Sequence, residues 1–197
     1  LAKERLRGDQ IFLFPNQENK LQIKLRQSSS NFLFQVLNKQ YQKLGFSELN
    51  DSDFANLCIA RIVEPTSKLD SLRVLSDLGI NDLSKDRLYR CLQKVIKNDY
   101  RKIIGQLCFD KADSQNLNLV LYDVTTLYFE VQEEDAYRRP GLSKERRLEP
   151  QIVIGLLVDS SGFPLSLHSF EGNTAETKTI IPVLEEFQKE HHLEKVT

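Results

Sequence analysis

The hydrophobic pattern of this 197-residue chain changes its period near Asn116, and that change limits the folds it can adopt. Upstream of that point, from Phe32 onward, apolar residues recur at steps of three and four, which predicts amphipathic helices. Downstream, the apolar runs are short and continuous, which predicts buried or half-buried strands. We therefore expect an α/β chain with a mainly helical domain at residues 1–113 and a second domain at residues 114–197.

The first domain is expected to hold five helices, preceded by two short strands at 11–14 and 21–25. The third helix is predicted to begin at Thr66 or Ser67, because Ser67 and Asp70 have the spacing of a capping box. It is predicted to end at Leu78-Gly79, since glycine commonly follows the last helical residue.

The third and fourth helices, around residues 66–97, have the length and the glycine-containing turn of a helix-turn-helix. In that case Lys85, Arg87 and Arg90 of the fourth helix would contact DNA. An ordinary helical bundle with a charged outer face is the alternative.

Composition narrows the class of protein. The formal net charge is −1, so DNA binding would have to come from local basic patches. Cys58, Cys91 and Cys108 lack the spacing of a metal site or a disulfide framework, which predicts reduced core residues in a cytoplasmic protein. No apolar run approaches the roughly 18 residues of a membrane span, so we expect no membrane association. Methionine is absent, even at position 1, so we expect the chain to be a fragment.

The second domain is predicted to contain strands at 117–125, 151–158 and 163–170, the last two joined by a turn at 159–162. A helix capped by Asn173, with Glu176 at the capping-box position, is expected next. Residues 196–197 would begin a fourth strand.

One acid, Asp123, lies inside the first predicted strand. Burying an acid there is costly unless it is paired or holds a metal. Strand-strand-strand-helix-strand is the opening order of the ribonuclease-H-like fold, in which this acid and one after the fourth strand hold two divalent ions ~4 Å apart. Mg²⁺, or Mn²⁺, suits such oxygen ligands. Asp123 is therefore predicted to be catalytic and metal-ligating; an acid hydrogen-bonded to a neighbouring loop is the alternative.

The polar segment 130–149, between the first two predicted strands, has an acidic half and a basic half. Its cations would contact DNA phosphates rather than bases: Arg138, Arg139, Lys144, Arg146 and Arg147. A loop that pairs its own acids and bases is an equally good interpretation of the charges.

Five sequence blocks carry a more specific likeness: 121–129, 140–147, 153–158, 162–165 and 170–179. Together they resemble the DDE transposases of bacterial insertion sequences, and residues 61–71 resemble the helical N-terminal region of that family. The resemblance implies metal-dependent cleavage of double-stranded DNA at the element's ends and transfer of the freed strand to target DNA. It also implies that Asp123 is the first acid of the catalytic triad, that the complete enzyme acts as a homodimer, and that it works on the bacterial nucleoid.

The same resemblance places the second acid just after a segment like 195–197 and the third much later. We therefore expect the second domain to be the first half of a ribonuclease-H-like fold, truncated and inactive alone. A truncated transposase that binds DNA or inhibits full-length subunits without chemistry is a second possibility. A third is a nucleotide-binding protein of actin-like topology, although its phosphate turn at 123–126 would lack the usual glycine.

Overall fold

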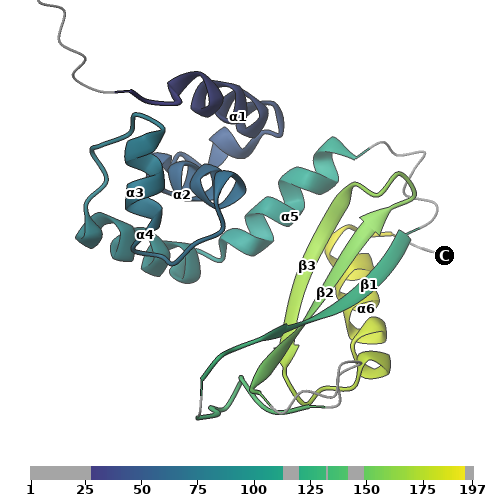
Figure 1. Cartoon of the computed structure of the whole chain (residues 1–197). Coiled ribbons are helices and arrows are strands. Elements are labelled where there is room, and N and C mark those ends of the chain that lie inside the picture. Colours follow the sequence, from purple (N-terminus) through teal and green to yellow (C-terminus); the bar gives the residue numbers. More distant parts are fainter. Residues whose placement is uncertain (1–27, 113–119, 132, 142–148, 194–197) are drawn as a thin grey trace, which may run out of the picture.

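The computed structural model describes residues 28–112, 120–131, 133–141 and 149–193, and Figure 1 shows their arrangement. Helices make up the first part of the chain, and a three-stranded antiparallel sheet with one further α-helix follows. The predicted mixture of helix and sheet is confirmed. The expected strands at 11–14, 21–25 and 196–197 lie outside the described residues.

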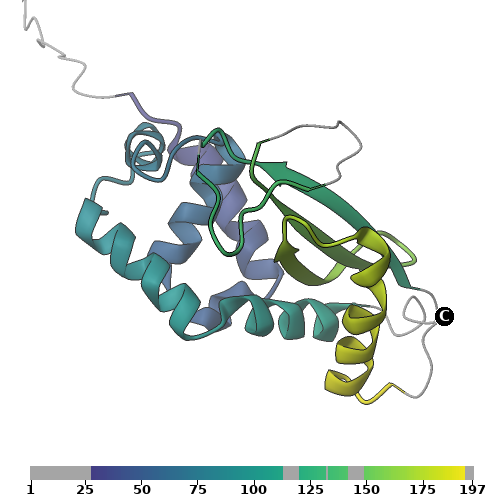
Figure 2. The same ribbon diagram turned by 90° about the horizontal axis from the view of Figure 1, so that it is seen from below.

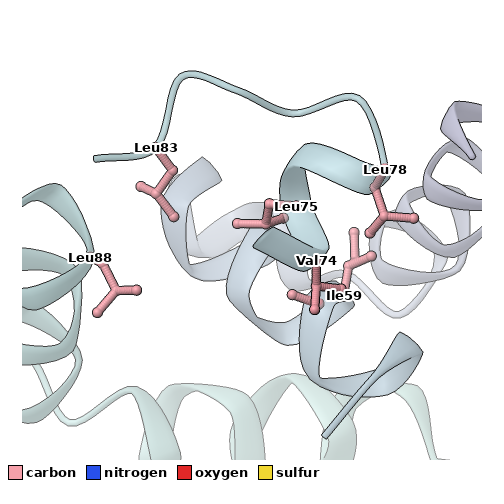
Figure 3. Packing of buried hydrophobic residues seen from close by; sticks show 7 residues of the cluster. Ile59, Val74, Leu75, Leu78, Leu83 and Leu88 are labelled. Atoms are coloured by element: carbon pink, nitrogen blue, oxygen red, sulfur yellow. The ribbon is translucent and has the colours of Figure 1, made fainter. Parts of the chain in front are cut away.

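The helical unit packs around one apolar core. Its elements are α1 (Asn31–Lys43), η1 (Phe46–Leu49), α2 (Ser52–Val63), α3 (Ser71–Asp77), α4 (Lys85–Lys97) and α5 (Tyr100–Lys111). The buried side chains labelled in Figure 3 come from α2, α3, α4 and the α3–α4 connection: Ile59, Val74, Leu75, Leu78, Leu83 and Leu88. No helix among the described residues is both long and apolar enough to cross a membrane.

Helix α3 begins later than the sequence predicts. Ser67 Oγ accepts a hydrogen bond from the Asp70 amide at 3.1 Å, as the capping pattern suggests, but this bond closes a turn at residues 68–70 that precedes the helix. The α-helix starts only at Ser71, so the prediction of Thr66 or Ser67 was wrong. The predicted end of α3 is confirmed, since Leu78 is its C-cap residue and Gly79 adopts the left-handed conformation with φ 87°.

The sheet has the order β1-β2-β3, with β1 (Val120–Tyr128), β2 (Gln151–Asp159) and β3 (Pro164–Glu171) all antiparallel to their neighbours. A tight turn joins β2 to β3, as predicted. The Asp159 carboxylate accepts hydrogen bonds from the Ser161 and Phe163 amides, and Gly162 takes the left-handed conformation with φ 86°.

The long helix after β3 is not capped by Asn173. A 3-10 turn, η3 (Glu176–Lys178), comes first, and α6 (Ile180–Glu190) follows with Thr179 as its N-cap residue. Thr179 is fully buried, and its hydroxyl donates to the Glu176 carbonyl at 2.7 Å. The predicted capping box was therefore wrong, because a 3-10 turn rather than an α-helix begins at Glu176.

Helix α5 connects the helical unit to the sheet (Figures 1 and 2). At its start Tyr100 packs edge-on against Phe54 of α2, with 5.2 Å between ring centroids. Near its end Phe109 packs against Phe187 of α6 at 5.8 Å. Phe187 belongs to a buried cluster with Val120, Leu157 and Leu165, which fixes α6 against one face of the sheet.

Replacing Phe187 by alanine tests this attachment. Phe187 is 1% exposed, so Phe187→Ala is expected to lower the free energy of unfolding by about 3–5 kcal/mol through lost burial and a residual cavity. Ile181→Ala on the same helix, where the side chain is 62% exposed, should change it by less than about 0.5 kcal/mol. Urea denaturation followed by circular dichroism measures both, and equal effects would contradict the packing of α6.

Candidate functional site

Asp123 lies near the middle of β1, opposite Leu156 of β2, and its side chain is exposed. Burial alternates along β1, so Tyr122 and Val124 lie on the face that α6 covers, whereas Asp123 lies on the opposite face of the sheet. The carboxylate makes no hydrogen bond or ion pair with any described residue. Because the side chain is exposed, the expected cost of burying this acid does not arise here.

The sheet face around Asp123 is apolar. Asp123, Leu156 and Leu167 form one row across the three strands. Four leucines on this face remain between 37% and 50% exposed: Leu121, Leu127, Leu156 and Leu167. An apolar groove of about 410 Å³ continues from this face toward the helical unit, where Phe46, Phe54 and Val95 line it. Exposed apolar patches of this kind commonly mark a surface that another segment or protein covers.

Arg87 is engaged inside the helical unit. Its guanidinium makes two hydrogen bonds to the Asp53 carboxylate of α2, at 2.5 and 3.2 Å, and a longer contact with Asp82 at 3.5 Å. The hydrogen bonds that the Asp53 carboxylate accepts raise the pKa of Arg87 above its ordinary value. Arg87 thus holds α4 against α2, which is a structural role that the sequence did not predict.

Lys85 and Arg90 are the predicted DNA contacts on α4 whose side chains remain exposed. Arg90 donates one hydrogen bond from Nε to the Asp86 carbonyl of its own helix at 3.4 Å. The connection between α3 and α4 covers residues 78–84, which is longer than the three- to four-residue turn of a typical helix-turn-helix. A DNA-reading role for α4 stays a prediction.

Arg138 and Arg139 pair with nearby acids. Arg138 Nε donates to Asp135 at 2.7 Å, and its guanidinium lies 5.5 Å from the ring centroid of Phe129. The amide and side chain of Arg138, with the Tyr137 amide, lower the pKa of Asp135 to about 2. Arg139 contacts Glu171 of β3 at 3.3 Å. Arg138 thus pairs within the loop and Arg139 pairs with β3. Lys144, Arg146 and Arg147 lie outside the described residues.

A glycine clamp holds this loop against the ends of β2 and β3; we use the name for Gly141, Gln151 and Gly172. The backbones of Arg139 and Gln151 exchange two hydrogen bonds of 3.1 Å, and the Gln151 side chain donates to the Gly172 carbonyl at 2.7 Å. A Cβ at Gly141 would lie 2.1 Å from the Gly172 oxygen, and one at Gly172 would lie 2.0 Å from the Gln151 oxygen. Only glycine fits these two positions, which belong to two blocks that carry the transposase likeness.

Asp51 forms a buried polar centre that the sequence did not reveal. Its side chain is 7% exposed and accepts hydrogen bonds from the Phe54 amide, the Tyr100 hydroxyl and Lys94 Nζ at 2.8–3.0 Å. Burial alone raises the pKa of Asp51, but the hydrogen bonds it accepts, the one from Lys94 foremost, outweigh burial and lower the pKa. The position just before α2 suggests an N-cap, but nothing local in the sequence points to the two distant partners.

A second groove, of about 560 Å³, lies between α5, β3 and α6. Its floor includes His168, which is 9% exposed and shares a 2.7 Å hydrogen bond with the Ser166 hydroxyl. His191 stacks on Phe109 with 3.7 Å between ring centroids. Burial lowers the pKa of both histidines, so they are neutral packing residues at pH 7.

Asp123 is the residue predicted to bind a divalent ion, so its surroundings decide whether the described residues can hold one. Within the ranges that the structure describes, no group of three or more His, Cys, Asp or Glu side chains could hold a metal ion. One exposed carboxylate supplies too few ligands for Mg²⁺ or Mn²⁺. The described residues therefore do not form the predicted two-metal site by themselves, and Asp123 would need carboxylates from elsewhere.

Comparison with known proteins does not assign the chain to a family. No family model matches it, and neither the curated proteins nor the solved structures contain a significant match. A functional assignment therefore depends on the residues and geometry described above.

Asp51 offers a direct test of the polar centre. Asp51→Ala is expected to lower the free energy of unfolding by about 2–4 kcal/mol, because it removes an N-cap and leaves Lys94 and Tyr100 without their acceptor. Asp51→Asn keeps an N-cap oxygen and should lose less. Chemical denaturation measures both, and an Asp51→Ala variant as stable as the parent would contradict this role.

The buried His168 and the half-buried His191 predict a pH dependence of stability. Their folded-state pKa values lie below the unfolded value of about 6.5, so the unfolded chain binds more protons as the pH falls. Their contribution to stability is complete above that pH and is lost as pH decreases through it toward the folded pKa values. The free energy of unfolding should therefore be lower at pH 5.5 than at pH 7.5.

His168→Gln should flatten this dependence, whereas His192→Gln, which replaces an exposed side chain, should leave it unchanged. Denaturation curves at a series of pH values measure the slope. The same slope in His168→Gln as in the parent would show that burial of His168 is not its cause.

Proposed function

We propose that this chain is part of a DNA transposase, with a helical unit that binds DNA and the opening strands of a ribonuclease-H-like catalytic core. The observation that carries the proposal is the place of Asp123. It sits mid-strand on the first of three antiparallel strands, on the face away from the helix that follows them. That arrangement agrees with the element order from which its catalytic role was predicted.

The availability of the Asp123 carboxylate supports this role. It is exposed, and no residue in the described part of the chain makes a polar contact with its oxygens. A divalent ion in such a core activates water or a 3′-hydroxyl and stabilises the leaving oxygen of DNA. The described residues supply only this one ligand, so the proposed chemistry belongs to the complete protein, in which further carboxylates would have to reach the same face.

The sequence blocks that resemble transposases contact one another in the structure, which also supports the proposal. The glycine clamp joins the blocks at 140–147 and 170–179, and the first two strands bring 121–129 against 153–158. Residues that carry the likeness therefore contact one another around the sheet, as expected if they belong to one functional core.

DNA binding is assigned to the helical unit, with Lys85 and Arg90 of α4 as the exposed cations that contact phosphates. Arg87 is assigned to the structure of the unit because Asp53 and Asp82 engage it. A protein that binds DNA without cutting it, as an inhibitor of complete subunits would, is compatible with the same contacts.

Selection of bound DNA from genomic fragments tests the proposal. The purified chain is expected to enrich a sequence that occurs as an inverted pair on either side of its own coding region. Arg90→Glu should weaken binding and lower the slope of log affinity against log salt by about 1, because a phosphate contact is lost. Lys39→Glu, the same charge change on α1, is the control and should have little effect.

Two results would argue against the proposal. Binding that shows no enrichment of a flanking inverted pair would remove the transposase assignment. Tight ATP binding by the chain, with no affinity for DNA, would favour the nucleotide-binding alternative instead.

A further inference from the structure

The register between β1 and β2 is not fixed by hydrophobicity alone. Both strands carry apolar residues on both faces, so the α6 face and the open face of the sheet are alike in character. A one-residue slip would bury Asp123 against α6 and is costly. A two-residue slip keeps every side chain on its face, so burial opposes it only weakly.

The connection between these strands does not fix the register either. Tight hairpin turns set which residues pair, and the short turn at 159–162 does this for β2 and β3. The connection from β1 to β2 runs from residue 129 to residue 150, so it is too long to set the pairing as a tight turn does. Its contacts in the glycine clamp hold it to β2 and to the end of β3 rather than along β1. An interaction between the two strands themselves is needed to specify that Asp123 pairs with Leu156.

Tyr122 and Gly155 supply that interaction. A Cβ at Gly155 would lie 2.0 Å from the Tyr122 hydroxyl oxygen, 2.6 Å from Cζ and 2.7 Å from Cε2, so the ring lies directly on the glycine. Gly155 is not among the glycines with positive φ. Glycine is therefore required here for space rather than for backbone conformation.

This fit exists in one register only. The residues two places from Gly155 on the same face of β2 are Val153 and Leu157, and both are buried. In a slipped register the Tyr122 ring would meet one of these side chains instead of the open surface of the glycine. The Tyr122 hydroxyl is buried and has no hydrogen-bond partner among the described residues, so the shape of the ring, not its polar group, makes the fit.

We propose that Tyr122 and Gly155 are positioning residues that fix where Asp123 lies along the sheet. A two-residue slip would move Asp123 by about 7 Å along β2, since each strand residue advances about 3.4 Å. Ligands of a metal pair ~4 Å apart cannot tolerate such a displacement. The importance of that displacement rests on the proposed function, whereas the register lock itself does not.

Disulfide trapping on the sheet face that carries Asp123 tests directly whether Tyr122 and Gly155 fix the β1–β2 register. Thr125 pairs with Ile154, so a double cysteine variant at these positions reports the native register. Thr125→Cys combined with Ile152→Cys or with Leu156→Cys reports the two slipped registers. Directly opposite Cα atoms lie about 4.5–5.5 Å apart and can form a disulfide, whereas diagonal pairs at about 7–8 Å cannot.

The native cysteines interfere little with this assay. Burial raises the pKa of Cys58 and of Cys91 to about 11 and also raises that of Cys108, so these thiols react slowly at pH 8. Mild oxidation and non-reducing mass spectrometry of peptides then give the ratio of native to slipped cross-links. Neither DNA nor metal is needed, so failure of the lock and failure of the proposed function give different results.

When Tyr122 and Gly155 are kept, the yield of the native-register disulfide is expected to exceed the yield of either slipped-register disulfide by about tenfold or more. Gly155→Val, which fills the space under the ring, and Tyr122→Ala, which removes the ring without a clash, should each lower this ratio at least about fivefold. Tyr122→Phe keeps the ring and should preserve the native ratio. The proposal is overturned if Tyr122→Ala, folded by circular dichroism, retains the native ratio, or if Tyr122→Phe loses it.

Discussion

The carboxylate of Asp51 is the point at which three helices of the N-terminal unit are joined. It caps α2, binds Lys94 of α4 and accepts a hydrogen bond from the hydroxyl of Tyr100, the first residue of α5. Because α5 continues to Phe109 and its contact with α6, the direction set at Tyr100 also determines where the sheet lies. A charge that is 7% exposed is stable here only because hydrogen bonds satisfy it. The relation between the helical unit and the sheet thus depends on one buried acid.

Asp123 is the opposite kind of acid. It is exposed, has no polar partner among the described residues, and stands among leucines on a face of the sheet that α6 does not cover. An exposed carboxylate without a polar partner contributes little to folding stability. The same surroundings explain why the sheet needs a specific fit such as that of Tyr122 on Gly155.

Local patterns predicted much of the fold. The change of period, the end of α3 at Gly79 and the turn at 159–162 depend on a few neighbouring residues, and all three agree with the structure. The Arg87–Asp53 and Asp51–Tyr100 contacts, which span 34 and 49 residues, could not be predicted because folding brings the partners together. Local reasoning also failed at Ser67 and Asn173, where a capping pattern is present but a turn or 3-10 helix follows. For the candidate site, the position of Asp123 in a strand was predictable, but its exposure was not.

The glycine clamp couples the end of β3 to residues 137–141 and to the start of β2. The Gly172 amide donates to the Tyr137 carbonyl at 3.1 Å, and the Gly172 carbonyl accepts the Gln151 side chain at 2.7 Å. Gly141 lies so close to the same carbonyl that a Cβ there would be 2.1 Å from its oxygen. A side chain at Gly141 or at Gly172 would therefore push these backbone segments apart. Residues 137–141 and the adjoining ends of β2 and β3 would then loosen as one unit.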